Sequence, residues 1–181
     1  MIILGIDPGS RKAGFAVIES IGKKLRYIDS GTLRFDTKMD FLNRLLEIKQ
    51  KVDELAITYQ PDEIALESLI YVKSPTALIK LAQARGVIIS SFLETHQHKI
   101  FEYSPNLIKA VTTGHGHADK DSVQKSLTTF LGVKDFETDD ESDALAVAYC
   151  HSLYRGKVTP LKTKKKRKGR GLSGALSHKI G

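Results

Sequence analysis

The sequence of 181 residues has no tryptophan, only two methionines and a single cysteine, Cys150. One cysteine excludes an intrachain disulfide and a zinc site built from several cysteines. Apolar residues surround Cys150 in the sequence, so we interpret it as a core residue. No apolar run is long enough for a membrane-spanning helix, and the run at residues 1–6 is too short for a signal peptide. We therefore expect a cytoplasmic protein with no membrane association.

Acidic residues are absent from residues 157–181, which contain nine of the 28 lysines and arginines. Residues 1–156 therefore carry 19 basic and 21 acidic residues, a net charge of −2, although the whole chain has a net charge of +7. Such a basic segment favours a polyanionic partner such as nucleic acid, and a solvated tail that only aids solubility is the alternative. We predict one domain over residues 1–155 and a basic, disordered tail over residues 156–181.

The residue patterns predict a β-meander followed by alternating helices and strands. Strands are predicted at residues 2–6, 13–20, 23–35, 62–67 and 99–104. Helices are predicted at residues 39–59, 74–97, 105–113, 119–132 and 139–154. Short links join the first three strands, whereas helices separate the later ones. The pattern therefore predicts an α/β fold with a mixed five-stranded sheet flanked by helices.

Four acidic residues lie at the ends of predicted elements. Asp7 follows the first strand, Glu67 ends the fourth, and Asp140 and Asp143 lie three residues apart at the start of the last helix. If the first and fourth strands are parallel neighbours, their carboxyl ends lie at one edge of the sheet, where ligand sites are favoured. Clustered carboxylates repel one another unless protons or cations neutralise them, and all-oxygen ligands suit Mg²⁺ or Mn²⁺. Two such ions can activate water and stabilise the leaving oxygen in phosphodiester cleavage, so we interpret Asp7 as a metal ligand.

Each of the four acids also has a purely structural explanation. Asp7 can cap the turn that contains Gly9, and Glu67 can be a surface charge at a strand end. Asp140 and Asp143 can complement the dipole of the last helix. Spacing alone therefore leaves open whether the four side chains converge.

Four stretches of the sequence resemble the RuvC family of bacterial Holliday junction resolvases. They read ILGIDPGSRKAGFAVIE, PDEIALE, ALIKLAQARGV and DESDALAVAYCH, and their order and spacing match the family over residues 1–155. The resemblance implies a ribonuclease H-like fold and a Mg²⁺-dependent endonuclease with two Mg²⁺ per active site, which Mn²⁺ can replace. It places the family's four catalytic metal ligands on Asp7, Glu67, Asp140 and Asp143.

The same resemblance implies DNA contacts and partners. The family's basic DNA-contact positions match Lys109 and Lys120, although the sequence without the resemblance favours ordinary solvated lysines there. At the position three residues after the strand-end glutamate, relatives have an aromatic residue that wedges into the opened junction. This chain has Ile70 there, followed by Tyr71, so we expect one of them to be the wedge unless both are simply packed. The implied partners are four-way junction DNA, a second copy bound through the helix at residues 74–97, and a branch-migration helicase complex of the RuvA and RuvB type.

Three other functions are compatible with the residues. An actin-like or sugar-kinase-like ATPase has a phosphate loop similar to DPGSRKAG, but it needs two such domains and this chain has length for one. A non-catalytic nucleic-acid-binding module gains nothing from four repelling carboxylates near phosphates. A ribonuclease H, or another structure-selective nuclease, would keep the fold and metal site and change the substrate.

Overall fold

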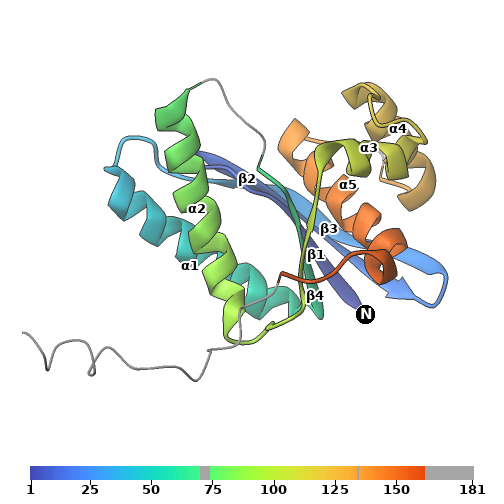
Figure 1. Ribbon diagram of the computed structural model, residues 1–181, viewed down its shortest axis with the longest axis horizontal. Helices are drawn as coiled ribbons and strands as arrows, with labels where there is room; N and C mark the ends of the chain where they lie inside the picture. Colours follow the sequence, from blue (N-terminus) through green and yellow to red (C-terminus); the bar gives the residue numbers. More distant parts are fainter. Residues whose placement is uncertain (70–73, 134, 162–181) are drawn as a thin grey trace, which may run out of the picture.

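One mixed sheet organises the molecule, with its five strands in the order β3-β2-β1-β4-β5 (Figure 1). The structure is a computed structural model that describes residues 1–69, 74–133 and 135–161. An antiparallel meander consists of β1 (Ile2–Asp7), β2 (Lys12–Ile21) and β3 (Lys24–Arg34). On the other side of β1, β4 (Glu63–Glu67) pairs in parallel with β1, and β5 (Ile100–Tyr103) pairs in parallel with β4. The predicted α/β, ribonuclease H-like sheet is thus confirmed.

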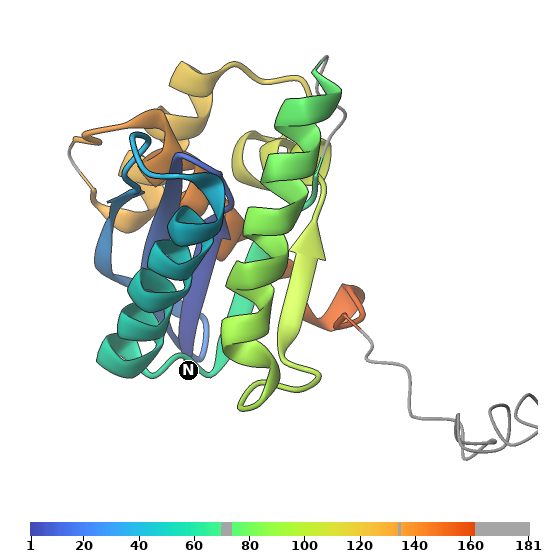
Figure 2. The ribbon, with the colours of Figure 1, turned by 90° about the vertical axis from the view of Figure 1, so that its left-hand side faces the viewer.

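Helices cover both faces of this sheet. On one face lie α1 (Phe41–Tyr59) and α2 (Pro75–Leu93), which run side by side in Figure 2. The opposite face carries α5 (Asp139–Tyr154), against which α3 (Pro105–Thr113) and α4 (Lys120–Leu131) pack. A short 3-10 helix, η1 (Arg155–Lys157), follows α5 and was not predicted. Each of the five α-helices begins at a polar N-cap whose side chain accepts a backbone N–H, namely Asp40, Ser74, Ser104, Asp119 and Thr138.

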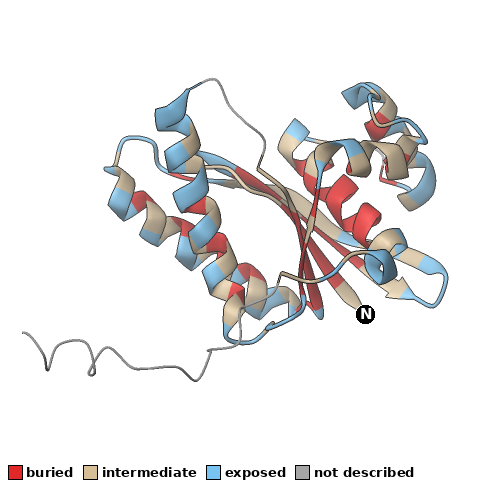
Figure 3. Ribbon diagram, in the orientation of Figure 1, coloured by how far each residue is buried: buried red, intermediate tan, exposed pale blue. Residues whose placement is uncertain are grey.

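The core has one hydrophobic cluster on each face of the sheet. Ile48 and Val52 of α1 join Ile88 and Phe92 of α2 on one side. On the other side α5 is buried along most of its length, as the red segments of Figure 3 show. The close approach of α5 needs glycine in the strands beneath it, because a Cβ on Gly5 would lie 2.4 Å from the backbone oxygen of Ala144.

Helix α2 differs from the sequence prediction in two ways. It ends at Leu93 instead of residue 97, and the chain turns back toward β5 through His98, whose φ of 66° is left-handed. With 19 residues, it is also long and apolar enough to cross a membrane by length and composition, so the expectation that no stretch of the chain is long enough was wrong. Its buried residues Ala84, Ile88 and Phe92 pack in the core beside α1, whereas the other residues of the helix are exposed or partly exposed.

Candidate active site

Strand pairing brings Asp7 and Glu67 together. Strands β1 and β4 are parallel neighbours in which Ile6 pairs with Leu66, so the two acids end adjacent strands at the same edge of the sheet. The two carboxyl groups lie close enough that each affects the pKa of the other. The predicted parallel arrangement of these strands is confirmed, and it places the two acids at the ends of neighbouring strands.

A glycine places Asp140 over the same edge. In the antiparallel pairing of β1 with β2, Asp7 lies opposite Gly14. A Cβ on Gly14 would lie 1.8 Å from the backbone oxygen of Asp140, so the first turn of α5 sits directly on the strand at this position. Asp143 follows one turn later, and its charge acts on both Asp7 and Glu67. The structure therefore brings all four predicted acids to one edge.

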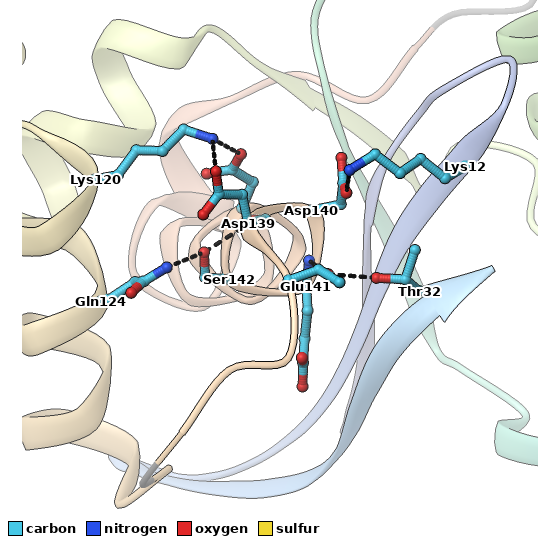
Figure 4. Close-up of polar contacts among 10 residues, drawn as sticks. Lys12, Thr32, Lys120, Gln124, Asp139, Asp140, Glu141 and Ser142 are labelled. Carbon is cyan, nitrogen blue, oxygen red and sulfur yellow. Dashed lines mark hydrogen bonds and ion pairs between the residues drawn. The ribbon is translucent and has the colours of Figure 1, made fainter. Parts of the chain in front are cut away.

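The first turn of α5 carries two further acids, Asp139 and Glu141, to which the sequence analysis assigned no role. Thr138 caps the helix by accepting the N–H of Glu141 at 3.2 Å, and its hydroxyl lies 2.5 Å from that of Thr32 on β3. The Glu141 carboxylate is buried away from the site, where it accepts hydrogen bonds from Ser30 and the backbone of Glu137. Figure 4 shows Glu141 directed away from Asp139 and Asp140. Glu141 is therefore structural.

Two lysines neutralise the acids from opposite sides of α5 (Figure 4). Lys120, at the start of α4, lies 3.0 Å from an Asp139 oxygen and 3.3 Å from an Asp143 oxygen. Lys12, the first residue of β2, forms an ion pair with Asp140. Lys120 was predicted through the family resemblance. Lys12 was missed, because its contact with Asp140 depends on the way α5 crosses β2.

A cavity of about 240 Å³ opens beside the acids. It is lined by Glu67 and Asp143 together with Lys109 of α3 and Lys120 of α4. Apolar side chains such as Ile108 and Val123 form the rest of its wall. Both lysines predicted as DNA contacts thus border the acid cluster, and their charges lower the pKa of Glu67 against the effect of burial. A phosphate entering this cavity would meet ammonium groups as well as carboxylates.

Burial and mutual repulsion raise the pKa of three acids. The pKa of Asp7 rises to about 8, first because of burial and then because of the charges of Glu67 and Asp143. Burial also raises the pKa of Glu67, and the charge of Asp143 adds to the effect. The pKa of Asp143 rises through burial, although Lys120 partly offsets the increase. The protein thus holds a proton in a cluster that lacks sufficient positive charge.

The chemistry of the donor set fits a hard divalent cation. The four side chains offer only carboxylate oxygens, the ligands that Mg²⁺ and Mn²⁺ prefer. The Oδ2 atom of Asp140 is buried and accepts no hydrogen bond in the described part of the chain, and its described partner is the Lys12 ammonium. Among the described residues, no group of three or more carboxylate, histidine or cysteine side chains is arranged to hold an ion. The residues that would hold it are nevertheless gathered at one edge.

Some predicted features lie outside the described residues. Ile70 and Tyr71, the candidate junction wedge, fall in residues 70–73, and most of the basic tail falls in residues 162–181. The described chain stops two residues after Glu67 and resumes at Ser74, the N-cap of α2.

Comparisons with known proteins agree with this geometry. The family model described as "Crossover junction endodeoxyribonuclease RuvC" matches residues 3–151. A protein of that name from Rhizobium etli is 38% identical over 154 residues, which are 85% of this chain and 90% of the relative. One from Legionella pneumophila is 39% identical over 160 residues, which are 88% of this chain and 91% of the relative. A solved structure of Thermus thermophilus RuvC in complex with a Holliday junction substrate superposes with a TM-score of 0.82 at 27% identity, covering 89% of this chain and 99% of that one.

Proposed function

The chain belongs to the RuvC family of crossover junction endodeoxyribonucleases, and we propose that it resolves four-way DNA junctions by paired, symmetric, metal-dependent nicks. The observation that carries the proposal is the convergence of Asp7, Glu67, Asp140 and Asp143 at one sheet edge, with Lys109 and Lys120 beside them. The solved relative bound to a Holliday junction supports the same substrate for this chain. The reaction belongs to DNA recombination and repair.

We propose Asp7, Glu67, Asp140 and Asp143 as the residues that hold two Mg²⁺ ions, which Mn²⁺ can replace. When bound there, two such ions supply the activation of water and the stabilisation of the departing 3′ oxygen in phosphodiester cleavage. Asp7 occupies the centre of the cluster, since the charges of Glu67, Asp143 and Asp140 all raise its pKa and it lies opposite Gly14, against which Asp140 packs. Its proton must leave before it can bind a cation, because the ligating form of a carboxyl is the carboxylate.

Lys109 and Lys120 are proposed as DNA contacts. Both line the cavity beside Glu67 and Asp143, where they reduce the repulsion between the acids and a phosphodiester. Their contacts go to the DNA backbone, which positions the strand without reading its sequence. Cleavage in this arrangement gives a 5′-phosphate end.

We propose that the enzyme acts as a homodimer in the cytoplasm, where junction DNA arises. A two-fold dimer matches the two symmetric nicks that resolution needs, because both active sites are related by the same operator as the junction. Helix α2 is the proposed contact, since only Ala84, Ile88 and Phe92 are buried along its length and Ile79 is 58% exposed. A branch-migration helicase complex of the RuvA and RuvB type is the proposed supplier of junctions.

Ile70 or Tyr71 is proposed as the wedge that opens the junction centre, because Ile70 follows Glu67 by only three positions in the chain. Replacing both with alanine is expected to weaken junction cleavage while leaving the fold intact. Unchanged junction cleavage by the double variant would contradict this assignment. The basic residues after 156 are proposed to add non-specific attraction to DNA phosphates.

The function is tested by incubating the chain with a synthetic four-way junction, a linear duplex of the same sequence and an RNA–DNA hybrid, with Mg²⁺ or with EDTA. Paired symmetric nicks in the junction that require the cation are expected. Cleavage of the hybrid alone would keep the metal site and replace the substrate. Binding of the junction without cleavage of any substrate would indicate a binding module, and ATP hydrolysis would indicate the phosphate-loop alternative.

A further inference from the structure

A second cavity lies on the other face of the sheet from α5, next to the turn that follows Asp7. Its volume is about 540 Å³, and it lies between that turn, the start of α1 and the start of α2. Three cationic side chains line it, Arg11, Arg44 and Lys80. Hydroxyl groups of serine and threonine residues complete most of the lining, and among the described residues no acid borders the cavity. Its walls therefore offer hydrogen-bond donors and positive charge.

Arg44 is the most unusual of these three cations, because it is only 7% exposed. Its guanidinium donates to the backbone oxygens of Asp36, Thr37 and Met39 at 3.0 to 3.2 Å. These acceptors are neutral, and the described residues give Arg44 no carboxylate partner. A buried charge normally has an opposite charge beside it. An anion bound from outside the protein would supply this opposite charge for Arg44.

The ring of Phe41 lies next to two of the three cations. The Arg44 guanidinium carbon lies 5.9 Å from the centre of the Phe41 ring, and the Lys80 ammonium lies 5.5 Å from it. Cation–π contacts of this kind hold two positive groups near each other without neutralising them. The third cation, Arg11, is exposed. Its backbone position is fixed by a hydrogen bond in which the Arg11 carbonyl accepts the N–H of Phe35 at 3.0 Å. The site is therefore built around its positive charges.

We propose that this cavity, named here the Arg44 pocket and formed by Arg11, Arg44, Lys80 and the hydroxyls of Ser10 and Thr76, binds a backbone phosphate of the DNA substrate. Guanidinium groups and hydroxyls together match the geometry and charge of a phosphodiester. The turn from Asp7 to Lys12 separates the Arg44 pocket from the acid cluster, so Lys109 and Lys120 contact DNA on one face of the sheet edge and the Arg44 pocket contacts it on the other. The identity of the anion as DNA rests on the proposed function.

The test uses the full chain with Arg11→Gln and Lys80→Gln combined, because both side chains are exposed whereas Arg44 supports its loop. The matched control combines Lys23→Gln and Lys24→Gln, which remove the same charge from the hairpin at the far end of β2. Junction affinity is measured in Ca²⁺ over a range of salt concentrations, and cleavage is measured in Mg²⁺. We expect the Arg44-pocket variant to bind roughly tenfold more weakly than the control, with a salt dependence reduced by about one counter-ion per lost contact. Equal affinity and equal salt slope in the two variants would overturn the proposal.

A second measurement does not depend on nuclease function. Inorganic phosphate at constant ionic strength is expected to raise the melting temperature of the parent chain and of the control, and to raise that of the Arg44-pocket variant much less. If phosphate stabilises the parent chain and not the variant, the Arg44 pocket is an anion site, whether or not the parent chain binds or cuts a junction. Failure of the parent chain to bind or cut a junction would contradict the proposed function and not the anion site. If phosphate stabilises all three proteins equally, the Arg44 pocket is not an anion site.

Discussion

Lys12 of β2 forms an ion pair with Asp140 of α5, and two glycines hold the pair in place. A Cβ on Gly9 would lie 1.8 Å from the backbone oxygen of Lys12, and one on Gly14 would lie equally close to the backbone oxygen of Asp140. The backbones of both partners are thus packed against the strand-end turn of β1 and β2. The Lys12 ammonium thus gives Asp140 a positive partner, a role that a bound metal ion would otherwise have.

Replacing Lys12 with methionine is expected to strengthen cation binding. The ammonium competes with a cation for Asp140, and Lys12 is 48% exposed, so its removal should raise the affinity for Mn²⁺ by about two- to fivefold. Titration calorimetry with Mn²⁺ and no DNA measures this directly. Lys24→Met serves as the control, since Lys24 lies at the other end of β2, and it should leave the affinity unchanged. Weaker Mn²⁺ binding in Lys12→Met would show that Lys12 supports the site instead of competing for it.

Asp7→Asn is expected to separate binding from cleavage. The amide keeps the size of the side chain and removes a carboxylate ligand at the centre of the cluster, so cleavage of a four-way junction should fall more than roughly a hundredfold. Junction affinity in Ca²⁺ should be maintained, because Lys109 and Lys120, the proposed contacts to the DNA backbone, are unchanged. Gel-shift and cleavage assays on the same preparation give both values. An active Asp7→Asn enzyme would remove Asp7 from the metal site.

The raised pKa of Asp7 predicts how stability depends on pH without divalent cations. The folded chain keeps the Asp7 proton up to a pKa of about 8, whereas the unfolded chain releases it near 3.8. Protonation therefore stabilises the fold fully below the lower value, and the stabilisation is lost as the pH rises through about 8. The buried His151, with a lowered pKa, gives an opposite slope only below its ordinary 6.5, so measurements above that value isolate the acids.

Melting temperatures in EDTA should accordingly fall from about pH 6.5 to about pH 8.5. Mg²⁺ should restore stability at the higher pH, because a cation replaces the proton in neutralising the cluster. Asp7→Asn should flatten the profile in EDTA. A melting temperature that rises over this range in the parent chain would be inconsistent with a shared proton at Asp7.

Gly14→Ala is expected to damage the site through packing. The new methyl group would lie 1.8 Å from the Asp140 backbone oxygen, so the start of α5 must move away from β2. We expect a loss of about 3 kcal/mol in the free energy of unfolding, at the upper end for overpacked cores, and a loss of junction cleavage. Gly156→Ala is the control, because nothing lies within 4 Å of its added Cβ. Denaturant unfolding gives the free energies, and equal values for both variants would mean that α5 adapts at no cost.

The positions of the four acids at element ends could be predicted because strand and helix ends are local features of a sequence. The apolar run before Asp7, the second such run before Glu67 and the polar start of the last helix all follow from neighbouring residues. Lys12 was missed for the opposite reason. Its position in the sequence resembles that of any lysine at the start of a strand, and its contact with Asp140 joins residues 128 positions apart. The Arg44 pocket was missed likewise, because it combines three separate segments.

By itself, the sequence determined the order of strands and helices, the position of the four acids at element ends and the basic character of the segment after residue 156. Hydrophobic periodicity and capping residues act over a few positions, so they can be interpreted without a fold. Only the tertiary structure decided that β1 pairs with β4, that Gly14 admits the start of α5, and that Lys12 and Lys120 flank its acids. These relationships depend on which surfaces pack together, and packing joins residues that no local pattern connects.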